Sequence, residues 1–147
     1  MKTIDSVVLP LYSTRSRLGD VPAKSGLNQW NADGRGRDLD EAYISVPAKV
    51  HDTNPTFFPE RDVPFLLRLP NGTHLTAKMC QEGRKALMTN PNRTLGKWIL
   101  RDVLNIKRGT LVSRQMLDDI GIDCVIVRKE REGLYSIDAR PDVHYRK

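Results

Sequence analysis

The chain has 147 residues, 39% hydrophobic and 29% charged, which is the composition of one globular domain with a core of its own. No hydrophobic run is longer than the four residues 124–127, which excludes a membrane span and the core of a signal peptide. We therefore expect a single cytoplasmic domain over residues 1–147, with no membrane partner.

The net charge of +6 comes from 24 basic and 18 acidic side chains. Its excess is concentrated in the middle of the chain, where residues 74–101 contain six basic residues and one acidic residue. Arginine outnumbers lysine by 15 to 9, and a planar guanidinium matches a phosphate or the O6/N7 edge of guanine. This distribution favours a polyanionic partner, with an ordinary solvated basic surface as the alternative.

Most of the chain is predicted to form short strands separated by turns. The dipeptide Asn71-Gly72 is the strongest hairpin signal, because both positions tolerate a positive φ. Glu82-Gly83 predicts a second turn, and Pro10 and Pro47 are typical of edge strands or strand ends. Strands are expected at residues 7–12, 42–46, 64–69, 73–81, 84–90, 124–129 and 134–139.

Two helices are expected between these strands. Thr94 is a suitable N-cap for apolar residues at helical spacing over 95–103. Ser113 is predicted to cap a second, shorter helix that ends at Gly121. The expected fold is mainly β (α+β): a mostly antiparallel sheet, closed or nearly closed, with two short flanking helices.

Catalytic motifs are missing from the sequence. No lysine has an acidic residue two positions before it, as the common metal-dependent nuclease core requires, and no histidine begins a His-x-Lys motif. Cys80 and Cys124 have no C-x-x-C spacing and are expected to be reduced core thiols. The sequence therefore predicts that this chain is not an enzyme and uses no cofactor or metal.

The first candidate reading surface is the glycine-rich stretch 24–40, which has no periodicity of either kind. Arg35 and Arg37 are suited to guanine, and a carboxylate accepts a hydrogen bond from the N4 amino group of cytosine. The alternative is that these arginines pair with Asp38 or Asp40 and stiffen the loop. The candidate DNA contacts in this stretch are Lys24, Asn28, Gln29, Trp30, Asn31, Arg35, Arg37, Asp38 and Asp40.

The second candidate surface is the predicted hairpin 78–93 and the residues that follow it. Amide side chains here are suited to adenine, and basic side chains to phosphate or guanine. The alternative is an ordinary solvated hairpin end. The candidate contacts are Lys78, Gln81, Arg84, Lys85, Met88, Asn90, Asn92, Arg93 and Lys97.

Two segments resemble a known family. The run SGLNQWNADGRGRDLDEAYISVP at 25–47 is similar to the start of the DNA-recognition domain of NgoFVII-like restriction endonucleases. The segment 57–104, with FFPER, KMCQEGRKALMTN and LGKWILRDVL, is similar to the rest of that domain. The resemblance implies a B3-like seven-stranded pseudobarrel that grips the major groove of DNA with two arms, here an N-arm at 25–40 and a C-arm at 81–93.

The resemblance also implies a biological setting. Such a domain follows a phospholipase D-type nuclease domain, so the expected partners are double-stranded DNA and a nuclease domain or subunit of the same prokaryotic restriction enzyme. The isolated domain is expected to be a monomer. The arginines Arg35 and Arg37, with the carboxylates that follow them, favour a short G·C-rich site. The alternative function is a stand-alone DNA- or RNA-binding regulator.

Overall fold

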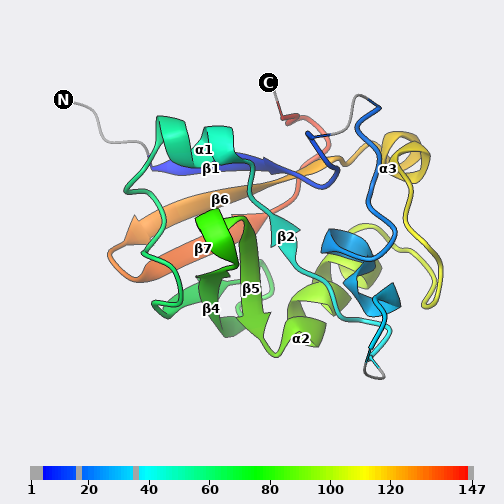
Figure 1. The fold of residues 1–147 in the computed structure, drawn as a ribbon, viewed down its shortest axis with the longest axis horizontal. Helices are drawn as coiled ribbons and strands as arrows, with labels where there is room; N and C mark the ends of the chain where they lie inside the picture. Colours follow the sequence, from blue (N-terminus) through cyan, green and yellow to red (C-terminus); the bar gives the residue numbers. More distant parts are fainter. Residues whose placement is uncertain (1–4, 16–17, 35–36, 146–147) are drawn as a thin grey trace.

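The computed structural model describes residues 5–15, 18–34 and 37–145. Seven strands form one sheet in the order β1-β6-β7-β3-β4-β5-β2 (Figure 1). All neighbours are antiparallel except β3 and β7, which are parallel. The strands are β1 (Ser6–Pro10), β2 (Ile44–Ser45), β3 (Phe65–Arg68), β4 (His74–Cys80), β5 (Ala86–Asn90), β6 (Cys124–Arg131) and β7 (Leu134–Asp138). The mainly β, seven-stranded prediction is confirmed.

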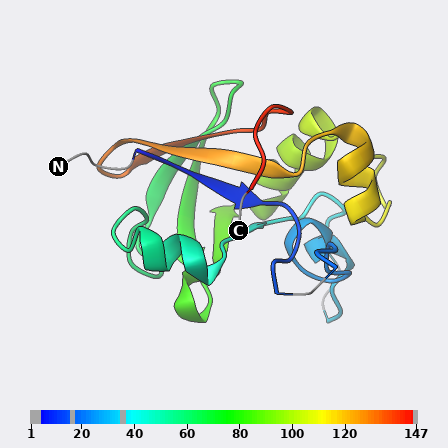
Figure 2. The same ribbon diagram turned by 90° about the horizontal axis from the view of Figure 1, so that it is seen from above.

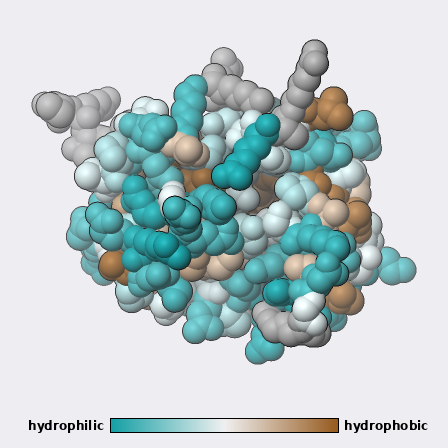
Figure 3. All heavy atoms as spheres, in the orientation of Figure 1, coloured by the Kyte–Doolittle hydropathy of each residue, from teal (hydrophilic) through white to brown (hydrophobic). Residues whose placement is uncertain are grey.

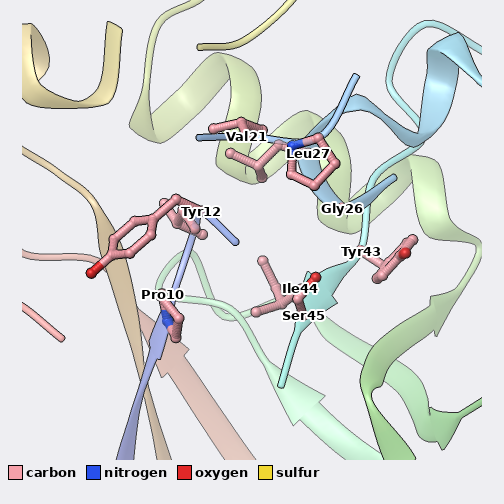
Figure 4. Close-up of a pocket in the computed structure, with 10 residues that line it drawn as sticks. Pro10, Tyr12, Val21, Gly26, Leu27, Tyr43, Ile44 and Ser45 are labelled. Atoms are coloured by element: carbon pink, nitrogen blue, oxygen red, sulfur yellow. The ribbon is translucent and has the colours of Figure 1, made fainter. Parts of the chain in front are cut away.

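The sheet curves into a pseudobarrel that is not closed. Its two edges, β1 and β2, lie side by side, but no hydrogen-bonded ladder joins them in the part of the chain that the structure describes. β2 has only two residues and ends before Pro47, which has no N–H to donate. Figure 4 shows Pro10 and Ile44 from the two edges around a small gap that Val21 and Leu27 cover. Side-chain packing therefore forms this seam.

The predicted hairpins are present. β3 pairs with β4 across the Asn71-Gly72 turn, where Gly72 has a φ of 89°. Along β4, Leu75, Ala77 and Met79 face the core while the residues between them are exposed. β4 returns along β5 and β6 returns along β7, so hairpins supply three of the six strand pairings in the sheet.

The helices are short, and α3 has the two caps that its sequence predicts. The helices are α1 (Ala48–Thr53), α2 (Asn92–Lys97) with its π-helical continuation η3 (Trp98–Val103), α3 (Arg114–Ile120), and the 3₁₀ turns η1 (Gly26–Asn31) and η2 (Glu82–Arg84). Ser113 Oγ accepts a hydrogen bond from Met116 N at 3.2 Å, and Gly121 ends α3 in a left-handed conformation, as predicted.

Three local predictions were wrong. α2 begins at Asn92, directly after Pro91, so Thr94 lies inside the helix and is not its cap. α1 was not expected, because its six residues are too few to show helical periodicity. Cys124 is a buried free thiol, but Cys80 is only half-buried because it lies on the outer face of β4. Among the described residues, no helix is long and apolar enough to cross a membrane.

Candidate nucleic-acid interface

A groove of about 900 Å³ opens on one face of the molecule. Its two walls are the segment that follows β1 and the turn between β4 and β5, which project to the same side in Figure 2. Figure 3 shows the hollow from the front, with hydrophilic side chains around it. The lining residues are Tyr12, Ser13, Thr14, Arg15, Pro22, Ser25, Tyr43, Ser45, Val46, Pro47, Ala48, Lys49, Gln81, Glu82, Gly83, Lys85 and Tyr145.

The lining of this groove is basic and rich in hydroxyl groups. Arg15, Lys49 and Lys85 are exposed cations, and Glu82 is the only acid among the lining residues. Serine, threonine and tyrosine hydroxyls, together with cations, are the usual donors to DNA phosphates. The groove therefore has the hydrogen-bond donors and positive charges that a polyanion requires. Arg15 and Lys49 were not predicted from the sequence, because no local pattern marks them.

The β4–β5 turn is held in one shape by Arg84. Its guanidinium donates to the carbonyl oxygens of Phe58 at 3.1 Å, Pro59 at 3.2 Å and Pro55 at 3.2 Å. Arg84 and Gln81 both adopt a positive φ, which side chains rarely tolerate unless their surroundings enforce it. Arg84 was expected to contact DNA, but three hydrogen bonds from its guanidinium are made within the protein, which gives it a structural role.

His51 from α1 supports the same turn. Its ring is buried, and Nε2 donates to the backbone oxygen of Arg84 at 2.7 Å. Burial lowers the pKa of His51 below its usual value, and the positive charge of Arg84 acts in the same direction. Nδ1 is also buried and has no hydrogen-bond partner among the described residues. The imidazole is therefore neutral, with its proton on Nε2.

Acidification is expected to weaken the domain through His51. Because its pKa is lower in the folded chain than in the unfolded one, the unfolded state binds the proton first as the pH falls below about 6.5. The contribution of neutral His51 is thus complete above that pH and is lost below it. His51→Gln should flatten the dependence of the unfolding free energy on pH between about 7.5 and 5.5. His74→Gln, on the exposed face of β4, is the control, and an equal flattening in both variants would contradict the assignment.

Asn28 is the clearest correction in the predicted N-arm. Its side chain is fully buried: Nδ2 donates to the carbonyl oxygens of Pro22 at 2.9 Å and Val112 at 3.0 Å, and Oδ1 accepts from Val112 N at 2.9 Å. Every polar atom of this amide is engaged inside the protein, so Asn28 cannot face DNA. It joins the N-arm to the segment before α3.

The other predicted contacts at 24–31 have mixed surroundings. Trp30 is half-buried and packs against the core. Asn31 is exposed and donates to the carbonyl oxygen of Ala23 at 2.9 Å, and Lys24 forms an ion pair with Asp33 at 2.6 Å on the surface. Gln29 Oε1 accepts from Asn92 Nδ2 at 3.4 Å, which links the predicted N-arm to the far end of the predicted C-arm.

The charged residues at 37–40 pair with Glu41 and with arginines of the segment after α2. Arg37 forms an ion pair with Glu41 at 3.2 Å, and its side chain is only 18% exposed. Asp40 accepts from Arg101 Nε at 2.9 Å, and both Asp38 and Asp40 lie 3.5 Å from Arg108. The partners of these aspartates are thus distant arginines and not Arg37, while Arg35 lies outside the described residues.

Arg101 and Gly96 seat this loop on α2 and η3. The Arg101 guanidinium also donates to the carbonyl oxygens of Leu39 at 2.9 Å and Ile106 at 2.7 Å. A Cβ at Gly96 would lie 1.6 Å from the carbonyl oxygen of Asp40, so only glycine fits against the loop. A glycine within a helical pattern is a sequence signal for such close approach.

The remaining predicted contacts are divided between two regions. Lys78 lies opposite Met88, and both are on the outer face of the sheet, as is Asn90. Asn92 Oδ1 accepts from Thr89 N at 3.0 Å, whereas Arg93 and Lys97 are exposed on α2. The tip of the predicted C-arm, at 81–85, lines the groove, and its other end, at 90–93, lies at the opposite end of β5 beside α2 (Figure 1).

Comparison with known proteins places this geometry in a family. Residues 3–130 match the family that is described as the NgoFVII C-terminal B3-like DNA-binding domain. No curated protein matches the chain. The structure of a hypothetical Arabidopsis thaliana protein is similar over 95% of both chains, with 11% sequence identity and a TM-score of 0.43. With most of its length matched, the chain belongs to the family of NgoFVII C-terminal B3-like DNA-binding domains.

Proposed function

We propose that this domain recognises a specific sequence in double-stranded DNA, with the duplex held in the groove between the segment after β1 and the β4–β5 turn. The observation that carries the proposal is the basic, hydroxyl-lined groove in a DNA-binding family. The major groove of B-DNA is wide enough to admit protein elements of this size. The working arms are then residues 12–15 with Ser25 on one side and residues 81–85 on the other.

The residues that we assign to DNA contacts are those whose side chains are not engaged within the protein. Gln81 lines the groove from a backbone with positive φ and has an amide suited to adenine. The preference for a short G·C-rich site depends on Arg35, since Arg37 is engaged by Glu41. Asn90, Arg93 and Lys97 are assigned to the edge of the interface, where they contact phosphates of a longer duplex.

We further propose that the domain supplies target recognition to a prokaryotic restriction endonuclease. The matched family is described as a C-terminal domain, which leaves the nuclease to another domain or subunit. The described residues contain no cluster of three metal-ligating side chains. The pure protein, as a monomer, should bind plasmid DNA and leave it intact with and without magnesium, and nicking that persists through purification would contradict this assignment.

Selection from a randomised duplex pool tests the recognition directly. A DNA reader should return one short site and bind it far more tightly than single strands or duplex RNA of the same sequence, because the deep, narrow major groove of RNA does not admit such arms. Equal binding to duplex RNA would favour the RNA-binding regulator instead. Enrichment of no sequence would leave only nonspecific DNA binding.

Lys85→Ala should weaken binding to all DNA sequences about equally. Loss of one phosphate contact is expected to lower the slope of log affinity against log salt by about 1. Arg131→Ala removes the same charge from the last residue of β6, which does not line the groove, and serves as the control. An unchanged slope for Lys85→Ala, or an equal change in both variants, would remove Lys85 from the interface.

A further inference from the structure

The segment after β7 returns to the groove. Cys124 Sγ donates to the carbonyl oxygen of Val143 at 3.0 Å, and His144 Nδ1 lies 3.0 Å from Asp123 Oδ1. The backbone oxygen of Asp123 also accepts from Leu11 N at 2.9 Å, next to the start of the first groove wall. Two contacts thus fix residues 143–144 beside the segment that follows β1.

These contacts bring Tyr145 into the lining of the groove. Its ring is half-buried and packs against the core, so its position does not depend on a ligand. Burial raises the pKa of Tyr145 above its usual value, and the phenol is therefore a neutral donor at physiological pH. Tyr145 and Tyr12 both line the groove, together with the cations Arg15 and Lys49.

We infer that Tyr145 is a DNA-contacting residue whose hydroxyl donates to a backbone phosphate, so that this one side chain adds a third side to the binding site. The inference rests on the proposed function, because it needs the duplex to occupy this groove. It goes beyond the family match, which covers residues 3–130 and ends before this segment. A tyrosine hydroxyl is a common hydrogen-bond donor to DNA phosphates, and such a contact does not depend on the base sequence of the DNA.

Removal of the Tyr145 hydroxyl should change DNA affinity in a different way from removal of a cation. Tyr145→Phe keeps the ring and its packing and removes only the donor. Loss of one hydrogen bond to a charged phosphate should weaken binding about tenfold for every duplex sequence. Because no charge is removed, the salt slope should remain that of the native protein, in contrast to Lys85→Ala.

The experiment measures affinity and salt slope for the full chain and for Tyr145→Phe, Tyr145→Ala and Arg140→Gln. Arg140 is the control in the same segment, since it is exposed, pairs with Asp142 at 2.7 Å and does not line the groove. Tyr145→Ala should weaken binding at least as much as Tyr145→Phe, and Arg140→Gln should leave it within about twofold of native. Thermal unfolding of each variant checks that the fold is retained.

Two results would overturn the inference. Native affinity in Tyr145→Phe, with weakened binding in Lys85→Ala, would remove Tyr145 from the interface and leave the proposed function intact. Native affinity in both variants would show that the groove itself is not the DNA site. NMR tests the contact in the native protein, without any substitution. The ring resonances of Tyr145 should shift when the selected duplex is added, and unshifted resonances would contradict the contact.

Discussion

Gly96→Ala is expected to destabilise the domain by about 3 kcal/mol, the upper range for overpacking a core contact. The Cβ would lie 1.6 Å from the carbonyl oxygen of Asp40 and 2.8 Å from its carbonyl carbon, both of which are backbone atoms. Alanine is intrinsically better than glycine in a helix by about 1 kcal/mol, so propensity alone predicts the opposite sign. The steric term should prevail because the hydrogen bonds from Arg101 to Asp40 and Leu39 also hold the loop at 38–41 in place.

Equilibrium unfolding in denaturant measures this effect. Lys97→Ala, one residue further along the same helix on its exposed side, should change the unfolding free energy by no more than about 0.5 kcal/mol. A gain of stability in Gly96→Ala would mean that the loop can move away from α2. In that case the N-arm would not be seated as described.

Asn28→Ala is expected to cost about 3 kcal/mol of unfolding free energy, within the range for leaving several buried groups without partners. The change removes three hydrogen bonds and leaves the backbone N–H and carbonyl of Val112 and the carbonyl of Pro22 unsatisfied. Because the side chain is fully buried, the folded variant should bind DNA with native affinity at low temperature.

The exposed Asn31 is the matched control for this change. Asn31→Ala removes one surface hydrogen bond to Ala23, so its cost should not exceed about 1 kcal/mol. Equal costs at the two positions would show that the Asn28 bonds are not formed as described. A loss of DNA affinity without loss of stability in Asn28→Ala would return this residue to the interface.

The features that were predicted best from the sequence depend on the chemistry of neighbouring residues in the chain. The Asn71-Gly72 turn and the Ser113 cap each depend on one or two residues whose backbone preferences are strong. The alternation along β4 likewise needs no knowledge of the rest of the chain. These short-range rules were sufficient for the hairpins, for α3 and for the mainly β class.

The site was harder to predict because its residues are separated along the chain. Asn28 and Arg37 are residue types that read DNA bases, but here their partners are Val112 and Glu41. Nothing local distinguishes a ligand-facing amide from a buried one whose partner is 84 positions away. Lys49 and Tyr145 were missed for the same reason, since only the fold brings α1 and the segment after β7 to one groove.

The open seam between β1 and β2 lies under the groove, because Tyr12 follows one edge strand and Ser45 ends the other. The two walls that continue from these strands are therefore connected by packed side chains and not by a ladder of backbone bonds. Changing the volume of a side chain such as Ile44 should alter the spacing of the walls without breaking the sheet. In such a domain, substitutions in the seam therefore provide a second way to change target specificity, in addition to substitutions at the residues that contact bases.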